Sequence, residues 1–211
     1  MKQASSLLLG VMSLAFNANS AELISNGSFE NVPFAMSGDG SYCYIGSTTF
    51  GCAGSLPGWS GIFVVIKSNS PAFSSSPNTA SDLYEVGVKV GSTISQTVSI
   101  PTNGTYQLSW SDAGRQFYGT ENYQVSFGAV VLATLSTIGG QSWSRHTVTF
   151  SANAGTSILS FAGNSQTDST AFIDNVSLTP VPELATSALF VSGLLVLVLA
   201  RTARHRSANE A

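Results

Sequence analysis

The sequence predicts an all-β fold, an antiparallel jelly-roll β-sandwich, flanked by an N-terminal signal peptide and a C-terminal transmembrane helix. Apolar and polar residues alternate with a period of two through the body of the chain, which is the pattern of half-buried strands. Polar turn segments separate these runs, roughly every 10 to 15 residues. No amphipathic helical pattern occurs between residues 22 and 180. Short strands with one apolar face are typical of sandwiches and barrels, and we favour the sandwich.

The alternation identifies the strands one by one. Ile94 and Val98 share one face of a strand, whereas Ser95 and Thr97 share the other. The same pattern predicts strands at residues 94–100, 106–111, 123–127, 130–135, 145–150, 158–161 and 171–178. Turn signals lie between them at residues 101–104, 128–129, 139–140 and 153–155. We expect residues 67–82, rich in Ser, Pro and Asn, to form a long surface loop.

The C-terminal segment predicts a membrane helix. Pro182 and Glu183 precede an uncharged apolar run, residues 184–200. At about 1.5 Å per residue this run forms a helix roughly 25 Å long, close to a hydrocarbon core of about 30 Å. A basic cluster follows, at Arg201, Arg204 and Arg206, and places this end in the cytoplasm by the positive-inside rule. The alternative, a buried core helix, would not end in an arginine cluster followed only by a short polar tail, residues 207–211.

The N-terminal segment has the pattern of a secretory signal peptide, residues 1–21. Lys2 is the only charge before Glu22, residues 7–16 are apolar, and small residues precede Glu22. An export signal and a stop-transfer helix together define a body, residues 22–180, that faces the periplasm or the outside. The body is long enough for one domain with its own core.

The C-terminal pattern resembles the PEP-CTERM sorting signal of Gram-negative bacteria over residues 181–206. Pro182 and Glu183 match its Pro-Glu-Pro stretch, Leu184 stands in place of the second proline, and residues 207–211 extend beyond the usual basic terminus. In that family a membrane protease, exosortase, is thought to recognise this stretch and remove the helix. The resemblance implies a protein first anchored in the inner membrane, then delivered to the cell surface, outer membrane or extracellular matrix.

Charge in the body is sparse and negative. Residues 22–180 contain four basic and nine acidic residues, a net charge near −5. Nucleic-acid binding requires a basic footprint, so this balance argues against nucleic acid as a partner. Hydroxyl and amide side chains are plentiful instead, as in many exported β-proteins.

Cys43 and Cys52 lie close together in a Gly- and Tyr-rich stretch. In an exported chain such cysteines pair, and closing a loop of about ten residues stabilises the fold by roughly 2 to 3 kcal/mol. The alternative, a metal or redox pair, fits no zinc or thioredoxin spacing. We expect a structural disulfide that staples an irregular surface loop.

Six short motifs of the body resemble, in their order, the galactose-binding-like jelly rolls that include many carbohydrate-binding modules. They lie at residues 26–30 (Asn-Gly-Ser-Phe-Glu), 56–59 (Leu-Pro-Gly-Trp), 83–87, 94–98, 105–110 and 172–178. The body is most similar to the domain-of-unknown-function 642 group, found in plant cell-wall proteins and in bacterial PEP-CTERM proteins. The resemblance implies a sugar-associated binding module without catalysis, with polysaccharide as its partner.

The resemblance also implies one structural calcium ion. In similar modules the acidic residue of the Asn-Gly-x-Phe-Glu segment and that of the last strand bind calcium; here these residues are Glu30 and Asp174. Calcium takes six to eight oxygen ligands, so backbone carbonyls and water would complete the shell. The alternative is that both carboxylates accept backbone N–H bonds in turns.

Sugar binding requires aromatic faces for the C–H side of the ring and polar groups for its hydroxyls. Trp59, after a Pro-Gly turn, provides an aromatic face, and a loop segment provides both kinds of group: Asp112, Arg115, Gln116, Phe117 and Tyr118. Within it we select Arg115 and Tyr118 as ligand-binding residues. The alternative for Trp59 is a core anchor that plugs the end of the sandwich. Trp110 shares a face with Tyr106 and is expected in the core.

The sequence contains no recognisable catalytic motif, and we expect that the protein is not an enzyme. His146 is aligned with inward-facing Val148, and no nucleophile elbow or His/Cys metal pattern occurs. A glycoside hydrolase would require a carboxylate pair drawn from Glu85, Asp112 and Glu121, but nothing in the spacing selects them. The main alternative to sugar binding is a structural or adhesive matrix protein without a sugar site.

Overall fold

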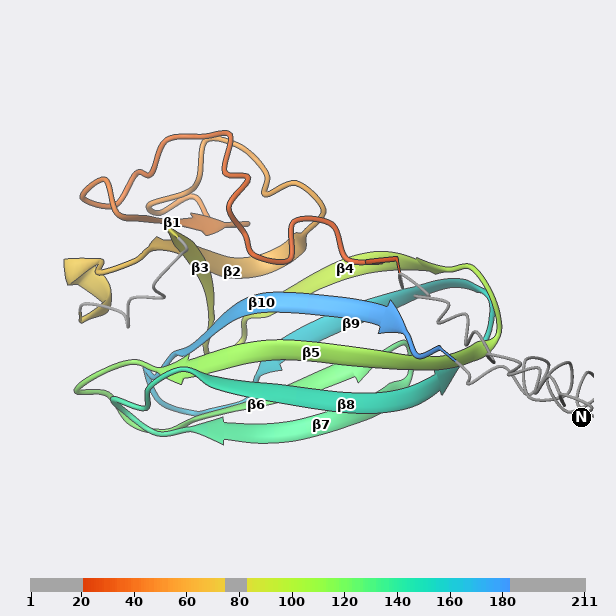
Figure 1. Ribbon diagram of the computed structural model, residues 1–211. Helices are drawn as coiled ribbons and strands as arrows, with labels where there is room; N and C mark the ends of the chain where they lie inside the picture. Colours follow the sequence, from red (N-terminus) through yellow and green to blue (C-terminus); the bar gives the residue numbers. More distant parts are fainter. Residues whose placement is uncertain (1–20, 75–82, 183–211) are drawn as a thin grey trace, which may run out of the picture.

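A computed structural model describes residues 21–74 and 83–182 (Figure 1). The predicted signal peptide therefore lies outside the described residues, apart from its last position. So do Glu183, the expected membrane helix 184–200, the arginines at 201, 204 and 206, and the tail 207–211. Within the described residues, no helix is long and apolar enough to cross a membrane.

The described chain forms ten strands and one short 3-10 helix. In order they are β1 (Tyr42–Ile45), β2 (Ser60–Lys67), η1 (Pro71–Phe73), β3 (Tyr84–Val88), β4 (Thr93–Ile100), β5 (Gly104–Gly114), β6 (Glu121–Phe127), β7 (Val130–Thr137), β8 (Ser144–Ala152), β9 (Gly155–Gly163) and β10 (Ala171–Pro180). The alternating runs found in the sequence correspond to β4 to β10. β1 and β2 were not predicted, because neither shows a simple period of two.

The strands pair antiparallel in two sheets that face one another (Figure 1). Sheet A has the order β1-β2-β3-β10-β5-β8. Sheet B has the order β2-β4-β9-β6-β7. This arrangement confirms the predicted all-β antiparallel jelly-roll β-sandwich.

Strand β2 contributes to both sheets. Its first residues, 60–62, pair with β4 in sheet B, whereas residues 64–67 pair with β3 in sheet A. Gly61 has a φ of +126°, and a Cβ built on it would lie 2.0 Å from the carbonyl oxygen of Thr93. Only glycine allows β2 to approach β4 this closely where the strand passes from one sheet to the other.

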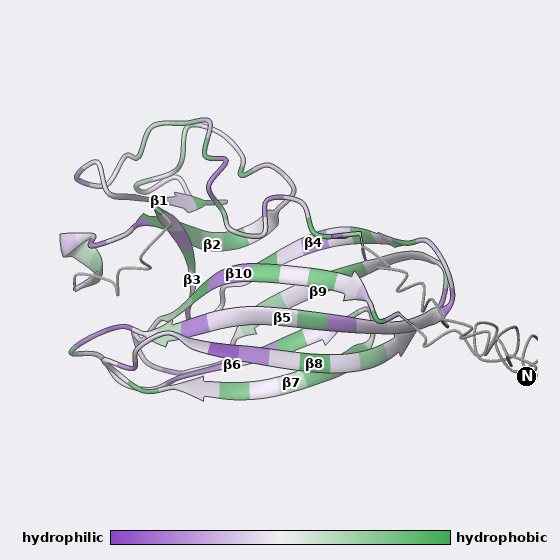
Figure 2. Cartoon of the chain, viewed as in Figure 1, coloured by the Kyte–Doolittle hydropathy of each residue, from purple (hydrophilic) through white to green (hydrophobic). Residues whose placement is uncertain are grey.

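The main core lies between the two sheets. Inward-facing side chains of the alternating strands, such as Ile94, Trp110 and Phe161, are at most 1% exposed. Many of their outward-facing neighbours are polar, and bands of differing hydropathy alternate along β5, β7 and β8 (Figure 2). Each buried side chain of this size contributes about 1.5 to 3 kcal/mol, so the period of two is the main energetic reason for the sandwich.

A second, smaller core covers the outer face of sheet A. It contains Val64, Ile66, Phe73, Ala113 and Phe172. Phe73 belongs to η1, inside the segment that the sequence analysis assigned to a long surface loop, yet it is only 3% exposed. The predicted surface loop, residues 67–82, thus contains a short helix whose Phe73 packs on the sheet; residues 75–82 lie outside the described residues.

The N-terminal segment runs along β10, so the two ends of the body are neighbours. The amide of Leu23 donates to the carbonyl of Leu178, and the amide of Val176 donates to the carbonyl of Gly27, both at 2.9 Å. A Cβ on Gly27 would lie 1.9 Å from the Val176 carbonyl oxygen. The Asn-Gly motif thus permits a close approach to the last strand.

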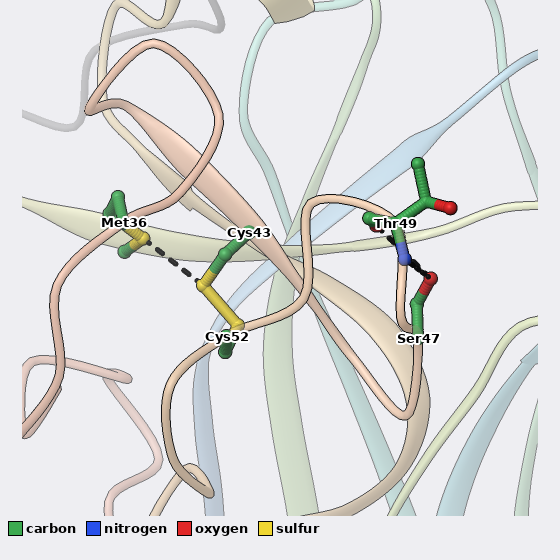
Figure 3. The surroundings of a disulfide bond; sticks show 5 residues. All are labelled: Met36, Cys43, Ser47, Thr49 and Cys52. Atoms are coloured by element: carbon green, nitrogen blue, oxygen red, sulfur yellow. Dashed lines mark hydrogen bonds between the residues drawn. A yellow bond between two sulfur atoms is a disulfide. The ribbon is translucent and has the colours of Figure 1, made fainter.

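The disulfide between Cys43 and Cys52 is present and links β1 to the end of the irregular loop that follows it (Figure 3). The two Cα atoms are 4.9 Å apart. Inside the loop, the Ser47 hydroxyl accepts the Thr49 amide at 3.2 Å. On the other side of the disulfide, Met36 Sδ, from the segment before β1, lies 3.4 Å from the Cys43 sulfur. The predicted structural disulfide is confirmed.

Replacing Gly61 with alanine will destabilise the sandwich. The added Cβ meets the Thr93 carbonyl, and L-residues rarely adopt this backbone conformation, so we expect Gly61→Ala to lower the free energy of unfolding by more than about 2 kcal/mol. The matched control is Gly104→Ala, because a Cβ there has nothing within 4 Å; its change should stay within about 0.5 kcal/mol. Urea unfolding measures both, and equal changes would contradict the assigned role of Gly61.

Candidate functional site

Three loops meet at one end of the sandwich, which we call the loop end: residues 115–120, 138–143 and 164–170. The amide of Gly114 donates to Gln141, and the amide of Arg115 donates to Thr170, at 3.0 and 3.1 Å. Gly139 passes so close to the first loop that a Cβ on it would lie 2.0 Å from the Tyr118 carbonyl oxygen. The loop end is therefore closely packed and joined to β5 and β10.

The guanidinium of Arg115 is held between two aromatic rings. Its central carbon lies 3.6 Å from the ring centre of Tyr118 and 4.7 Å from that of Phe73. Nη2 donates to the carbonyl of Ala72 at 2.8 Å, and Nη1 lies 3.9 Å from the Asp168 carboxylate. Each cation–π contact contributes on the order of 1 kcal/mol when partly desolvated. Arg115, only 8% exposed, thus clamps η1 to the loop end.

The clamp defines what Arg115 and Tyr118 can offer a ligand. One face of the Tyr118 ring is covered by the guanidinium, and 37% of the residue remains exposed. Arg115 presents little surface, so its contribution is to fix the position of Tyr118. The structure therefore brings these two predicted residues together, with Arg115 in a positioning role.

Phe117 belongs to the loop segment in which the sequence predicted sugar contacts, although only Arg115 and Tyr118 were selected from it. It is 86% exposed and has a φ of 67°, in the left-handed region that a bulky residue rarely adopts. Ile138 of the neighbouring loop is 62% exposed. We call Phe117, Tyr118 and Ile138 the loop-tip patch. Its only sequence signal was the run of two aromatics after Arg115.

Trp59 does not join this patch. It is 4% exposed, its indole N–H donates to the Asn26 carbonyl at 2.9 Å, and its ring packs on Phe29 with centres 5.2 Å apart. A ring in this position has no free face for a sugar. The expectation that Trp59 lines a ligand site is therefore corrected in favour of the core anchor.

Glu30 and Asp174 both lie where β3 meets β10. Oε1 of Glu30 accepts the amides of Leu83 and Tyr84, each at 2.8 Å. β3 and β10 pair Val86 with Ile173, so the next position in this register places Asp174 opposite Glu85. Asp174 and Glu85 are both fully buried, and Asp174 Oδ1 accepts the amide of Asn175 at 2.6 Å.

The described residues show no cluster of three or more His, Cys, Asp or Glu side chains arranged as a metal site. Glu30 makes the backbone contacts that the alternative interpretation expected of it. Asp174 accepts the Asn175 amide, as that interpretation also expected. Carboxylate oxygens are also the ligands that calcium takes. Glu85 was considered in the sequence only as a candidate for hydrolysis.

A polar network lies inside the sandwich near the loop end. Asp112 accepts hydrogen bonds from the hydroxyl of Tyr123 at 2.7 Å and from the side-chain Nε2 of Gln141 at 3.0 Å. His146 Nε2 lies 2.9 Å from the same carboxylate. The Trp110 indole donates to the Tyr123 hydroxyl at 2.9 Å. Burial raises the pKa of Tyr123 far above its ordinary value, and the negative charge of Asp112 adds to this, against the opposing effect of the Trp110 bond.

The three carboxylates considered for hydrolysis do not face a common cleft in the described residues. Asp112 lies between the sheets, whereas Glu85 lies on the outer side of sheet A, and both are at most 1% exposed. Glu121 is fully buried and accepts the amide of Ser165 and the hydroxyl of Ser169, at 3.1 and 2.8 Å. Glu121 thereby anchors the 164–170 loop.

No family model and no curated protein matches this chain. Solved structures with a similar fold include carbohydrate-binding modules. TmCBM61, in complex with β-1,4-galactotriose, is 18% identical with a TM-score of 0.48, over 77% of this chain and all of that one. The CBM22-1 xylan-binding domain of Paenibacillus barcinonensis Xyn10C is 10% identical with a TM-score of 0.44, over 74% and 93%. The C-terminal CBM6 of LamC from Zobellia galactanivorans is 23% identical with a TM-score of 0.39, over 49% and 84%. The ligands named belong to those proteins.

The buried Tyr123 hydroxyl will make stability fall at alkaline pH. Its pKa is raised in the folded state, so the unfolded chain loses this proton first; the stabilisation is complete below about pH 10 and is lost as pH rises above it. Tyr123→Phe removes this term. We expect the difference in free energy of unfolding between wild type and Tyr123→Phe to shrink between about pH 8 and about pH 11. Urea unfolding at both pH values measures it, and a constant difference would contradict the assignment.

Proposed function

We propose that this chain is an exported, surface-associated, non-catalytic binding protein whose loop-tip patch binds a polysaccharide. The observation that carries the proposal is the exposure of Phe117, Tyr118 and Ile138 together at one packed end. An exposed aromatic and aliphatic cluster of this kind marks an interaction site in a soluble domain. Its place on closely packed loops reduces the entropy lost on binding.

Polar groups surround the patch as recognition of a sugar requires. Gln116 lies against Gly140, the Thr167 hydroxyl lies 3.7 Å from the position of a Cβ on Gly119, and the Asp168 carboxylate is 66% exposed beside Arg115. Sugar rings present C–H faces to aromatics and hydroxyls to amides and carboxylates. The aromatic faces supply contact area, and these polar groups supply orientation.

The arrangement of the carboxylates supports a binding role over a hydrolase. Glu85, Asp112 and Glu121 are buried, and Asp112 and Glu121 hold strands or loops through hydrogen bonds. A glycoside hydrolase needs two carboxyl groups on either side of a substrate. We therefore propose no reaction for this chain.

The same chain is proposed to reach the cell surface through its C-terminal sorting signal. The run 184–200 anchors it in the inner membrane, with Arg201, Arg204 and Arg206 on the cytoplasmic side. An exosortase-like protease is the processing partner, acting at the Pro182-Glu183 stretch. The disulfide between Cys43 and Cys52 supports an oxidising compartment for the body.

Phe117→Ala will weaken polysaccharide binding without affecting the fold. The side chain is almost fully exposed, so its loss removes ligand contact but little packing; we expect about a tenfold loss of affinity for the retained glycan. Affinity electrophoresis of the full chain in detergent against a panel of neutral and acidic polysaccharides measures it.

Ile158→Ala is the matched control, because Ile158 is 53% exposed on the outer face of sheet B. Its mobility should equal that of the wild type. Retention of no polysaccharide by the wild type would refute sugar binding. Capture of a matrix protein that depends on Phe117 would favour the adhesive alternative, which the same exposed patch also permits.

We also propose one structural calcium ion held by Glu30 and Asp174, with backbone carbonyls and water completing its shell. The ion would tie the N-terminal segment to β10, contributing stability and no chemistry. The support is the full burial of Asp174 on β10, together with the bond of Glu30 to the start of β3, the strand that pairs with β10.

Calcium will raise the melting temperature of the wild-type protein, and chelation will lower it. At a calcium concentration 100 times the dissociation constant the gain is about 2.7 kcal/mol. Asp174→Asn should abolish this response, whereas Asp39→Asn, in an exposed turn, should keep it. Scanning calorimetry with calcium or chelator measures the effect, and a calcium-independent melting temperature in the wild type would exclude the ion.

A further inference from the structure

The chain leaves the sandwich at the end opposite the loop end, which we call the exit end. Pro180 pairs with Tyr106 near the start of β5, and the amide of Val181 donates to the Thr105 carbonyl at 2.9 Å. β5 pairs here with the last residues of β8. In Figure 1 the arrowhead of β10 lies at this end, and the arrowhead of β5 lies at the other.

The β6–β7 hairpin tip lies at the same end. Phe127, the last residue of β6, packs on Phe150 of β8 with ring centres 5.0 Å apart. Phe150 pairs with Tyr106, so the hairpin tip and the departing chain are linked through two packed residues. The β6–β7 tip, the turn between β8 and β9 and the start of β5 therefore form one face of the molecule.

This face is apolar and carries no charge in its three turns. Residues 100–106, 126–132 and 150–158 contain no Asp, Glu, Lys or Arg. Val130 is 61% exposed and Val131 is 51% exposed. An open groove of about 330 Å³ lies between the tips, lined by Phe127 to Val130 and Phe150 to Ser157. Glu22, on the neighbouring N-terminal segment, accepts the Leu178 amide and the Ser177 hydroxyl.

The short segment between β10 and the apolar run limits how far the exit end can lie from a membrane. Three residues separate Pro180 from the apolar run that begins at Leu184. Fully extended, the four Cα–Cα steps from Pro180 to Leu184 span about 14 Å. If residues 184–200 lie in a bilayer, the exit end cannot be farther than this from the hydrocarbon boundary. The headgroup region, which lies outside that boundary, is itself roughly 5 to 7 Å thick.

We propose that the exit end is a membrane-contact surface, in which Val130, Val131 and the groove rest on the lipid headgroup region. The inference rests on the proposed anchor and goes beyond it, because it assigns the orientation of the body. The loop-tip patch then points away from the bilayer, into the compartment that the body faces. Since the three turns are uncharged, the contact is apolar and requires no anionic lipid.

The test compares two positions of equal exposure at opposite ends of β7. Val130 and Ile138 are 61% and 62% exposed. Val130→Cys and Ile138→Cys are each labelled with an environment-sensitive fluorophore in the full chain; Cys43 and Cys52 form a disulfide and do not react with the label. The chains are reconstituted into phosphatidylcholine vesicles with or without a quencher attached to the lipid headgroup.

We expect a blue-shifted emission and strong quenching for the Val130→Cys label, with neither for the Ile138→Cys label. High salt should leave the signal unchanged. A label at Val131→Cys, on the same tip, should behave like the first. This pattern supports a body that rests on the bilayer by its exit end.

Three outcomes overturn the inference, and they are distinguishable. Chains that do not float with the vesicles would overturn both the anchor and the membrane contact. Chains that float but show equal quenching at the two positions would overturn the contact alone and leave the anchor. A shift at Val130→Cys that grows with protein density at fixed lipid would assign the face to a second copy of this chain.

Discussion

The membership of β2 in both sheets is the constraint on which the rest of the structure depends. Its first residues hydrogen-bond to β4 and its last to β3, so one strand holds the two sheets together at one side. Gly61 makes this possible because any Cβ there would collide with the Thr93 carbonyl. Phe63 and Val65 then enter the main core, while Val64 and Ile66 enter the smaller core outside sheet A. Each sheet is positioned by a different part of the same strand.

The position of β3 beside β2 also explains why the two ends of the body meet. β10 adds to β3, and the N-terminal segment runs along β10. Glu30 and Asp174, 144 positions apart, thus lie at one junction. The same pairing extends through β5 to the loop end, where Arg115 joins η1 to the loops. The candidate calcium site and the clamp of the loop end are therefore consequences of one strand order.

The two ends of the sandwich differ in chemistry, and this difference underlies the proposal of a tethered binding module. The loop end carries Arg115, Asp168 and exposed aromatic surface on closely packed loops. The three turns of the exit end carry no charge and present two exposed valines. A molecule held at its exit end would place the loop end as far from the point of attachment as its strands allow. Recognition and attachment would then not compete for the same surface.

The period of two was sufficient to predict β4 to β10, because each of these strands has one buried and one solvated face. β2 escaped the pattern for a physical reason: residues 63–66 are all buried, since the smaller core covers the face that would otherwise be polar. The disulfide could be predicted from the short spacing between Cys43 and Cys52 and from the expected export of the chain. The role of Trp59 could not be predicted, because a Pro-Gly turn does not show whether the indole ring that follows it points into the core or toward solvent.

The sequence by itself determined the architecture of the body, its pairing of cysteines and the chemical character of its segments, because these depend on local alternation and spacing. The tertiary structure decided which residues meet. Phe73 reaches Arg115 across 42 positions, Ile173 pairs with Val86, and Phe117 is left exposed while Trp59 is enclosed. Such contacts depend on strand order and register, which no single segment encodes, and burial is a property of the assembled sheets.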